Sequence, residues 1–203
     1  MGSVEKYMID IISKRRSIRK FKSNEIPQDM IEEILNAGIL APSSKNRQPW
    51  KYIVVSGKEK NTMILAMQKG IKREHEYPVM PNCNQWISGA EYSLNVMSQA
   101  PVTIFIVNTL GLDLFSPLTA EERIFEICNI QSIGASIQNM GLTATALGLG
   151  SLWICDIYFA YNELKTWLNI DGELCAALSI GYADEAPHSR PRNNLNDIVE
   201  WRK

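Results

Sequence analysis

The segment 120–147 constrains the fold more than any other feature, because it carries one uninterrupted helical pattern. Its larger apolar residues fall on nearly every side of the helix, at Ile124, Ile127, Cys128, Ile130, Ile133, Ile137 and Met140. A surface helix would show a single apolar stripe, so this pattern predicts a helix that is buried on several sides. The small residues Ser132, Gly134, Ala135 and Ser136 would let a second helix approach closely. We therefore expect a long central helix, with a subunit interface as one surface that could cover it.

Shorter patterns before and after this helix predict both strands and helices. Apolar and β-branched runs predict strands at 51–55, 101–107, 151–154 and 174–180, with 101–107 as the clearest buried strand. Helical spacing predicts helices at 4–13, 27–38, 58–73, 91–99 and 162–168, whereas 74–90, with two prolines and no period, is predicted to be a loop or lid. Because strands and helices do not alternate regularly, we expect an α+β fold in a single domain over 1–203.

Composition argues against several classes of function. The 203 residues carry 21 basic and 22 acidic side chains, a net charge of -1, so the overall charge attracts neither nucleic acid nor an anionic membrane. The N-terminus lacks a signal-peptide pattern, and no apolar run approaches the roughly 18 residues of a membrane span. The four cysteines are far apart and form no CxxC pair, which argues against a disulfide framework or a zinc site. Only two histidines are present, which argues against a histidine-rich metal site or a Ser-His-Asp triad. We expect a cytoplasmic protein with reduced cysteines.

Two arginine-rich motifs near the two ends of the chain are candidates for binding phosphate. The first is Arg15-Arg16-Ser17-Ile18-Arg19-Lys20-Phe21, and the second is His188-Ser189-Arg190-Pro191-Arg192. Guanidinium groups match phosphate oxygens in bidentate geometry, and a serine hydroxyl adds a further donor. Considered alone, each motif is better explained as a solvated segment than as a phosphate site: the first as a basic turn or a nucleic-acid patch over 14–22, and the second as a tail.

Two other motifs could approach a planar or polyol ligand. The loop Pro42-Ser43-Ser44-Lys45-Asn46-Arg47-Gln48-Pro49-Trp50 offers amide donors and acceptors at Asn46 and Gln48, but could equally be an ordered connection before a strand. In Gly148-Leu149-Gly150-Ser151-Leu152-Trp153-Ile154-Cys155, the glycines either end the long helix or let the backbone come close to a ring. The motif is not a dinucleotide fingerprint, because Trp153 stands where the third glycine would be and a helix precedes it.

Together, in this order and over almost the whole chain, the four motifs resemble those of the nitroreductase family of FMN flavoproteins. Arg15-Arg16-Ser17-x-Arg19-x-Phe21 is similar to the family's opening motif, and Ala41-Pro42-Ser43-Ser44-x-Asn46-x-Gln48-Pro49-Trp50 to its second and most specific one. Ala146-Leu147-Gly148-Leu149-Gly150-Ser151 followed by Trp153-Ile154 resembles the third, and Arg190-Pro191-Arg192 the basic pair near the end. The resemblance implies a central, mainly antiparallel sheet flanked by helices, in an intertwined homodimer with FMN at its interface.

The resemblance also implies where each matched residue would contact FMN. Those at the phosphate and ribityl chain would be Arg15, Arg16 and Ser17, with Arg190 and Arg192 closing on the phosphate. Arg19 would lie at the pyrimidine end of the flavin, where a cation stabilises negative charge on the reduced ring. The other subunit would contribute Pro42, Ser43, Ser44, Asn46 and Gln48. The backbone at Trp153, Ile154 and Cys155 would approach the flavin N5 edge, and no side chain of the protein would act as a nucleophile.

The function implied by the family is that of an NAD(P)H-dependent FMN oxidoreductase. NAD(P)H would deliver hydride to the flavin and leave before a small acceptor takes its place, which gives ping-pong kinetics. Nitroaromatics, quinones, free flavin or activated alkenes are all conceivable acceptors, and some members dehalogenate aromatics or fragment the flavin itself. Two alternatives stand beside this function: a non-catalytic flavin-binding or redox-sensing dimer, and a nucleic-acid module built on 14–22, against which the near-zero net charge counts.

The roles of several nearby residues stay open at this point. Asp156 would disfavour flavin reduction if its carboxylate pointed at the ring. Cys155 is expected to be a small buried hydrophobe rather than a redox thiol. The aromatic and sulfur-containing side chains of 74–90 form either a substrate cover or core packing beneath a loop, namely Tyr77, Met80 and Trp86. Asn95 is the candidate for a mid-chain asparagine that some members place on the flavin.

Overall fold

The computed structural model describes residues 3–80 and 82–203, with side chains from residue 7 onward. Its centre is a sheet of four strands, β1 (Trp50–Ser56), β2 (Val102–Asn108), β3 (Gly150–Ile154) and β4 (Glu173–Gly181). The strands lie in the order β1-β2-β4-β3, and each neighbouring pair is antiparallel. The α+β class, the antiparallel sheet and the four predicted strands are therefore confirmed.

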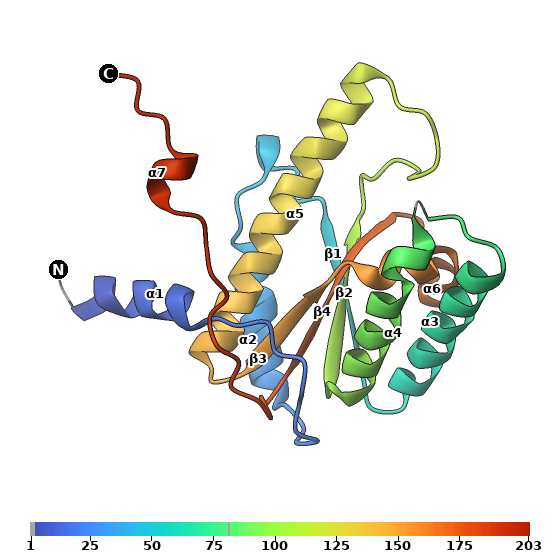
Figure 1. Cartoon of the computed structure of the whole chain (residues 1–203), viewed down its shortest axis with the longest axis horizontal. Coiled ribbons are helices and arrows are strands. Elements are labelled where there is room, and N and C mark those ends of the chain that lie inside the picture. Colours follow the sequence, from blue (N-terminus) through green and yellow to red (C-terminus); the bar gives the residue numbers. More distant parts are fainter. Residues whose placement is uncertain (1–2, 81) are drawn as a thin grey trace.

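Helices cover both faces of this sheet (Figure 1). On one face lie α2 (Gln28–Ile39) and α5 (Ala120–Ala146), and on the other lie α3 (Glu59–Glu76), α4 (Cys83–Gln99) and α6 (Tyr161–Leu168). Since both faces are covered, the central strands β2 and β4 are buried along their whole length, as a continuous apolar run predicts. Alternate side chains of β2 enter different cores: Phe105 and Val107 pack with α3 and α4, and Ile104 and Ile106 with α2 and α5.

The long helix α5 agrees closely with the predicted span 120–147. A capping box starts it, in which the Thr119 hydroxyl accepts from the Glu122 N–H at 3.3 Å and the Glu122 carboxylate accepts from the Thr119 N–H at 2.8 Å. Gly148, with a φ of 77°, ends it in the left-handed conformation that glycine adopts without strain. One of the two roles expected for these glycines, to end the helix, is thus present.

Burial along α5 differs between its two halves. The C-terminal half carries side chains that are at most 2% exposed, namely Ile133, Ile137 and Met140. The N-terminal half carries apolar side chains that are 62%, 50% and 45% exposed, namely Ile124, Ile127 and Ile130. The prediction of burial on several sides is therefore wrong for the N-terminal half within one chain, because none of the elements that the structure describes covers these isoleucines.

The segment 74–90 is mostly helical, so the predicted loop is wrong. α3 continues to Glu76 and α4 begins at Cys83, which leaves 77–82 as the connection; Pro81 within it lies outside the described residues. Both prolines therefore fall in one short connection rather than marking a long loop. From Cys83 onward, buried residues recur at helical spacing through Ile87 and Ala90, and exposed polar and aromatic neighbours concealed that period. The helix predicted at 91–99 is the second half of α4.

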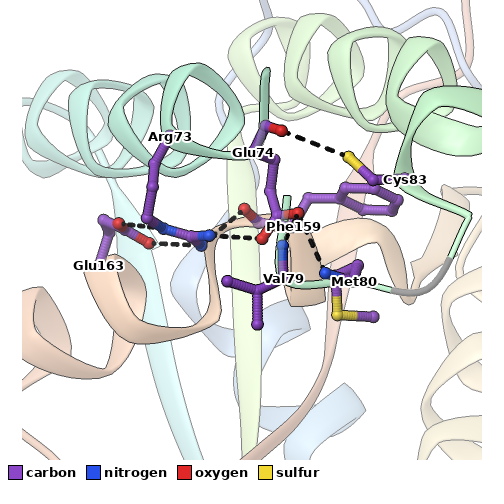
Figure 2. A network of polar contacts seen from close by, with 7 residues as sticks. All are labelled: Arg73, Glu74, Val79, Met80, Cys83, Phe159 and Glu163. Carbon is purple, nitrogen blue, oxygen red and sulfur yellow. Dashed lines mark hydrogen bonds and ion pairs between the residues drawn. The ribbon is translucent and has the colours of Figure 1, made fainter. Parts of the chain in front are cut away.

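A buried carboxylate holds Val79 and Met80, in the connection between α3 and α4, in place (Figure 2). Glu74, near the end of α3, is fully buried, and its Oε2 accepts hydrogen bonds from the backbone N–H groups of Val79 and Met80 at 3.0 and 3.1 Å. The Arg73 guanidinium donates to the other oxygen, Oε1. A carboxylate is costly to bury unless it is paired and hydrogen-bonded, and here both oxygens have partners. This anchoring argues against a freely moving lid at Val79 and Met80.

The same arginine ties α3 to the turn that follows β3. Arg73 Nε donates to Glu163 Oε1 of α6 at 2.9 Å, and Arg73 Nη2 donates to the Phe159 carbonyl at 3.4 Å (Figure 2). Phe159 lies in the short 3-10 helix η2 (Asp156–Ala160). α3 comes so close to this turn that a Cβ added to Gly70 would lie 2.3 Å from Cα of Ala160. These contacts fix the backbone immediately after β3.

The four cysteine thiols, Cys83, Cys128, Cys155 and Cys175, are all free. Within residues 3–80 and 82–203, no helix has both the length and the apolar character needed to cross a membrane. The same residues contain no group of three or more histidine, cysteine, aspartate or glutamate side chains arranged to hold a metal ion.

Replacement of Arg73 by methionine tests how much the fold depends on this network. The Arg73→Met substitution leaves the buried Glu74 carboxylate without its countercharge, so we expect the free energy of unfolding to fall by about 3–5 kcal/mol. Lys72→Met is the matched control, because Lys72 makes only an exposed 3.9 Å contact with Glu76, and we expect a change within about 0.5 kcal/mol. Urea unfolding followed by circular dichroism measures both, and equal losses in the two variants would contradict the assignment.

Candidate functional site

The two ends of the chain meet beside β3 through backbone hydrogen bonds. After α1 (Ser3–Lys14), the Ile18 N–H donates to the Ser151 carbonyl at 3.0 Å along the outer edge of β3. The Lys22 N–H then donates to the Tyr182 carbonyl, just after β4, at 2.9 Å. The approach requires a glycine, because a Cβ added to Gly150 would lie 2.7 Å from Cγ1 of Ile18. The segment that follows β4 is thereby brought back to the segment that follows α1.

A cavity of about 290 Å³ lies where these two segments meet. Five arginines line it: Arg15, Arg16, Arg19, Arg190 and Arg192. No carboxylate lines it, and none of these arginines forms an ion pair with a carboxylate among the residues that the structure describes. Guanidinium groups collected without a countercharge can bind an anion with several oxygen atoms, such as a phosphate.

The positions of these arginines are set mainly by the backbone around them. Arg16 Nη1 donates to the Ser13 carbonyl at 2.6 Å, and Arg19 Nη1 donates to the Ser17 carbonyl at 3.2 Å. The Arg19 N–H also donates to the Glu185 carboxylate, which joins the two lining segments. All six residues predicted at the phosphate end and at the pyrimidine ring surround this one cavity, namely Arg15, Arg16, Ser17, Arg19, Arg190 and Arg192.

The loop 42–48 does not reach this cavity in its own chain. None of Pro42, Ser43, Ser44, Asn46 and Gln48 lines it. The Ser44 N–H donates to the Ser132 hydroxyl of α5 at 3.4 Å, whereas Arg15, which lines the arginine cavity, approaches α5 at Gly141, where an added Cβ would be 3.9 Å from its Cδ. Ser132 and Gly141 are nine residues apart on one helix, or about 13 Å along its axis.

The loop itself is ordered and locally strained. Lys45, Asn46 and Gln48 have φ values of 54°, 53° and 49°, in the left-handed region that residues other than glycine seldom adopt. Two contacts hold it: the Gln48 N–H donates to the Ser43 hydroxyl at 3.0 Å, and the Arg47 guanidinium lies 4.2 Å from the ring centroid of Phe125 in α5. Strain of this kind often accompanies functional sites, where the surroundings hold an unfavourable backbone in place.

The end of β3 presents an accessible edge. Trp153 is 43% exposed, and its ring lies over α5, 3.6 Å from a Cβ added to Gly134. Ile154 is buried, whereas Cys155 is exposed, so the expectation that Cys155 is buried is wrong. Partial burial of the sulfur, and then the charge of Asp156, raise the pKa of the Cys155 thiol above its usual range. The thiol therefore stays protonated at neutral pH, which does not favour a thiolate nucleophile.

The Asp156 carboxylate turns away from this edge. Its Oδ2 accepts a hydrogen bond from the Ser93 hydroxyl of α4, on the side of the sheet that α3 and α4 cover. Of the candidates for a cover, Tyr77 and Trp86 are 72% and 57% exposed, so core packing is wrong for these two, while the half-buried Met80 packs against the core. Asn95 is exposed on α4, and no contact of the described residues assigns it a role.

Several residues of the arginine cavity were not predicted as site residues. Ile12 and Ser13 lie in the last turn of α1 beside the first arginines, and Pro187 precedes the C-terminal motif. The available signal for these three was proximity in sequence to an arginine motif, whereas His188 and Ser189 belong to the predicted C-terminal motif, of which only the arginines were expected to contact FMN. Glu185 was also missed, because nothing in its sequence neighbourhood indicates that it binds the Arg19 backbone across the molecule.

Comparison with known proteins agrees with this architecture. The model of the Nitroreductase family matches residues 12–182. A protein of Methanothermobacter thermautotrophicus, to which NADH dehydrogenase/NAD(P)H nitroreductase activity is ascribed, is 30% identical over 194 residues, covering 93% of this chain and 84% of its own. A BluB-like flavoprotein of Clostridium difficile 630 is 24% identical and has a TM-score of 0.79, covering 97% of this chain and 99% of its own. The FMN-dependent nitroreductase NfnB of Mycobacterium smegmatis, solved in complex with NADPH, is 17% identical with a TM-score of 0.74, covering 99% of this chain and 100% of its own.

The two solved structures share the fold of this chain, and at 24% and 17% sequence identity they support an assignment of the fold but not of a function. The family model, by contrast, spans the first arginine motif, the loop 42–50, α5 and the whole sheet, and ends just before the C-terminal arginines. By this sequence match over most of its length, the chain belongs to the nitroreductase family of oxidoreductases.

Proposed function

We propose that this protein binds FMN in the arginine-lined cavity and along β3, and uses it to carry reducing equivalents from NAD(P)H to a small acceptor. The observation that carries the proposal is the collection of five arginines, without a carboxylate, around one cavity at the junction of the chain ends. When bound there, FMN supplies the hydride and electron chemistry, while the protein supplies binding, orientation and electrostatics.

The cavity suits the phosphate end of FMN. An FMN phosphate carries roughly two negative charges, as a phosphoserine does, and each charge-assisted hydrogen bond to it contributes on the order of 1.5–3 kcal/mol. Arg15, Arg16 and Ser17 would hold the phosphate and ribityl chain, and Arg190 and Arg192 would close over them. The volume of about 290 Å³ lies at the low end for a ligand pocket, which suits part of a cofactor whose ring extends beyond it.

The flavin ring would extend along β3. This strand begins at Gly150, beside the arginine segment, and ends at Ile154 next to the exposed Cys155. The backbone at Trp153, Ile154 and Cys155 would lie at the reactive edge, and Arg19 would face the pyrimidine end, where its charge stabilises a reduced, anionic ring. The direction of the Asp156 carboxylate, toward Ser93, removes the negative charge that would otherwise oppose reduction.

A homodimer would complete the site. The loop 42–48 lines no part of the arginine cavity of its own chain, so Ser43, Ser44 and Asn46 would contact the flavin of a partner. The exposed isoleucines of α5 supply an apolar surface for that partner. Two copies that pack through α5 would each place a loop at the other's cavity.

The acceptor would be a small planar or unsaturated molecule, such as a nitroaromatic, a quinone, a flavin or an activated alkene. The exposed rings of Tyr77 and Trp86 would cover it. Tyr77 begins the connection in which Glu74 holds Val79 and Met80, and Trp86 lies in α4, so the cover would be formed before the acceptor arrives rather than fold over it.

Spectra of the purified protein test the proposal directly. We expect a yellow protein with a flavin spectrum, which NADH or NADPH bleaches under anaerobic conditions and a nitroaromatic or quinone restores. A yellow protein that neither nucleotide bleaches would instead support the non-catalytic flavin-binding dimer. A colourless protein that does not bind added FMN would contradict both.

The C-terminal arginines should discriminate FMN from riboflavin, which lacks the phosphate. In the double variant Arg190→Gln/Arg192→Gln, we expect the dissociation constant for FMN to rise at least tenfold while that for riboflavin changes little, because only the phosphate contacts are lost. Quenching of flavin fluorescence measures both constants. Lys203→Gln, an exposed change in the same tail, is the control, and an equal loss of both ligands in the double variant would show that these arginines do not bind the phosphate.

Mixed dimers test whether two chains build each site. Arg15→Gln/Arg16→Gln damages the cavity and Asn46→Asp damages the loop, so a purified heterodimer of the two variants would hold one intact and one doubly damaged site. We expect the heterodimer to regain about half of the wild-type NAD(P)H-dependent activity, while each variant homodimer has little. If one chain built the whole site, both sites of the heterodimer would be damaged and no activity would return.

A further inference from the structure

Asp156 places a negative charge at the exposed end of β3. It is the first residue of η2 and directly follows Cys155, which is exposed. Its carboxylate acts on this edge: after partial burial of the sulfur, the charge of Asp156 is the second cause that raises the pKa of the Cys155 thiol. No lysine, arginine or histidine among the described residues forms an ion pair with Asp156. The place of this charge therefore depends on its neutral neighbours.

The Ser93 hydroxyl of α4 holds the carboxylate of Asp156. It donates to Asp156 Oδ2, and it is the hydrogen-bond partner of that carboxylate among the described residues. Ser93 is 6% exposed, so water competes little for this bond. A hydrogen bond to an ionised acceptor is roughly twice as strong as one between neutral groups. A single buried hydroxyl therefore sets which way this carboxylate points.

The helix α4 also leaves room for the carboxylate one turn before Ser93. The residue at that turn is Gly89, and a Cβ added to it would lie 4.0 Å from Asp156 Oδ2. Residues four positions apart share one face of a helix, so Gly89 and Ser93 approach the carboxylate from the same side. The glycine allows close approach without a competing side chain, and the serine supplies the donor.

The backbone around Asp156 is fixed, so the torsions of its side chain decide where the charge lies. In the same turn, Ile157 and Phe159 are 0% and 6% exposed. The Phe159 carbonyl accepts from Arg73 Nη2 at 3.4 Å, which ties the turn to α3. If the bond to Ser93 were lost, the carboxylate could rotate toward the end of β3 without any movement of the chain.

We propose that Ser93 is a positioning residue, which raises the reduction potential of the bound flavin by holding the Asp156 carboxylate against α4. The inference rests on the proposed FMN site, in which the backbone at Cys155 lies at the reactive edge. Reduction adds negative charge to the flavin ring, and a carboxylate that turned toward the ring would oppose it. Because the interaction between two charges weakens with distance, the rotation of one side chain is enough to change the potential. Ser93 needs no contact with the flavin or with the acceptor.

The midpoint potential of the FMN-loaded protein tests this role. In Ser93→Ala we expect the equilibrium constant for two-electron reduction to fall about tenfold, which is a potential about 30 mV lower, because the freed carboxylate can turn toward the ring. Spectral titration against a reference dye under anaerobic conditions measures the potential. Ser98→Ala is the matched control: it removes a hydroxyl of the same helix, which donates to the Asn95 carbonyl at 2.7 Å, and it should leave the potential unchanged.

The variant Asp156→Asn decides whether Ser93 acts through the charge. Asparagine keeps the shape of the side chain and an oxygen that can accept from Ser93, but it carries no charge. We expect the double variant Ser93→Ala/Asp156→Asn to have the same potential as Asp156→Asn, because no charge is left for Ser93 to hold. A merely structural role of Ser93 would instead shift the potential equally with and without the charge of Asp156.

The reactivity of the Cys155 thiol gives a second readout, which requires neither flavin nor turnover. The rate of reaction with dithiobis(nitrobenzoate) follows the thiolate fraction at each pH, and the signal is assigned by its loss in Cys155→Ser. We expect the pKa of this thiol to fall in Asp156→Asn, because a negative charge is removed. We expect it to rise further in Ser93→Ala, because the freed carboxylate comes closer to the sulfur. The measurement uses the full chain, with or without bound FMN.

The two readouts separate a failure of this inference from a failure of the proposed function. If neither the potential nor the thiol pKa changes in Ser93→Ala, the role of Ser93 is overturned while the FMN site stands. An equal shift of the potential with and without the charge of Asp156 would overturn it as well. A wild-type protein that binds no FMN would overturn the proposed function and the effect on the potential together, and the thiol pKa would still show whether Ser93 holds the carboxylate.

Discussion

The backbone hydrogen bonds that carry 17–22 between β3 and the segment after β4 are the contacts on which the rest of the structure depends. They join two parts of the chain that are more than 130 residues apart, from Ile18 to Ser151 and from Lys22 to Tyr182. Because these bonds fix the backbone on both sides, five arginines from the two ends face one cavity. Without them, each motif would be a solvated basic segment, which is the usual state of such sequences.

The helix α5 gives the molecule its second constraint. Its C-terminal half packs in the core against the sheet and approaches Arg15 at Gly141, while its N-terminal half holds the loop 42–48 and exposes isoleucines. One helix therefore separates the two parts of the proposed flavin site by about 13 Å. The absence of the loop from the cavity of its own chain is the reason for proposing that two chains build each site, and such a dimer would cover the isoleucines of α5 that are exposed within a single chain.

The fold was predictable where burial produces a clear periodicity. The continuous apolar run of β2 and the long pattern of α5 each predicted the correct element, because helices cover both faces of β2 and the C-terminal half of α5 packs in the core. The segment 74–90 was not predictable in the same way. Its prolines suggested a loop, yet α3 and α4 extend into the segment from its two ends. Glu74 holds the short connection between them by accepting hydrogen bonds from Val79 and Met80. Glu74 is also paired with Arg73, which in turn bonds to Glu163 of α6. No local pattern encodes such a network.

The sequence by itself determined the chemistry that is available: arginines and serines suited to phosphate, an amide-rich loop, a glycine-flanked strand and a family resemblance that the whole chain supports. Only the tertiary structure decided which of these groups share a cavity. It placed the two arginine motifs together, kept the loop 42–48 apart, turned Asp156 toward Ser93 and exposed Cys155. The reason is that side-chain type is local information, whereas distance, burial and missing partners depend on chain segments far apart in sequence.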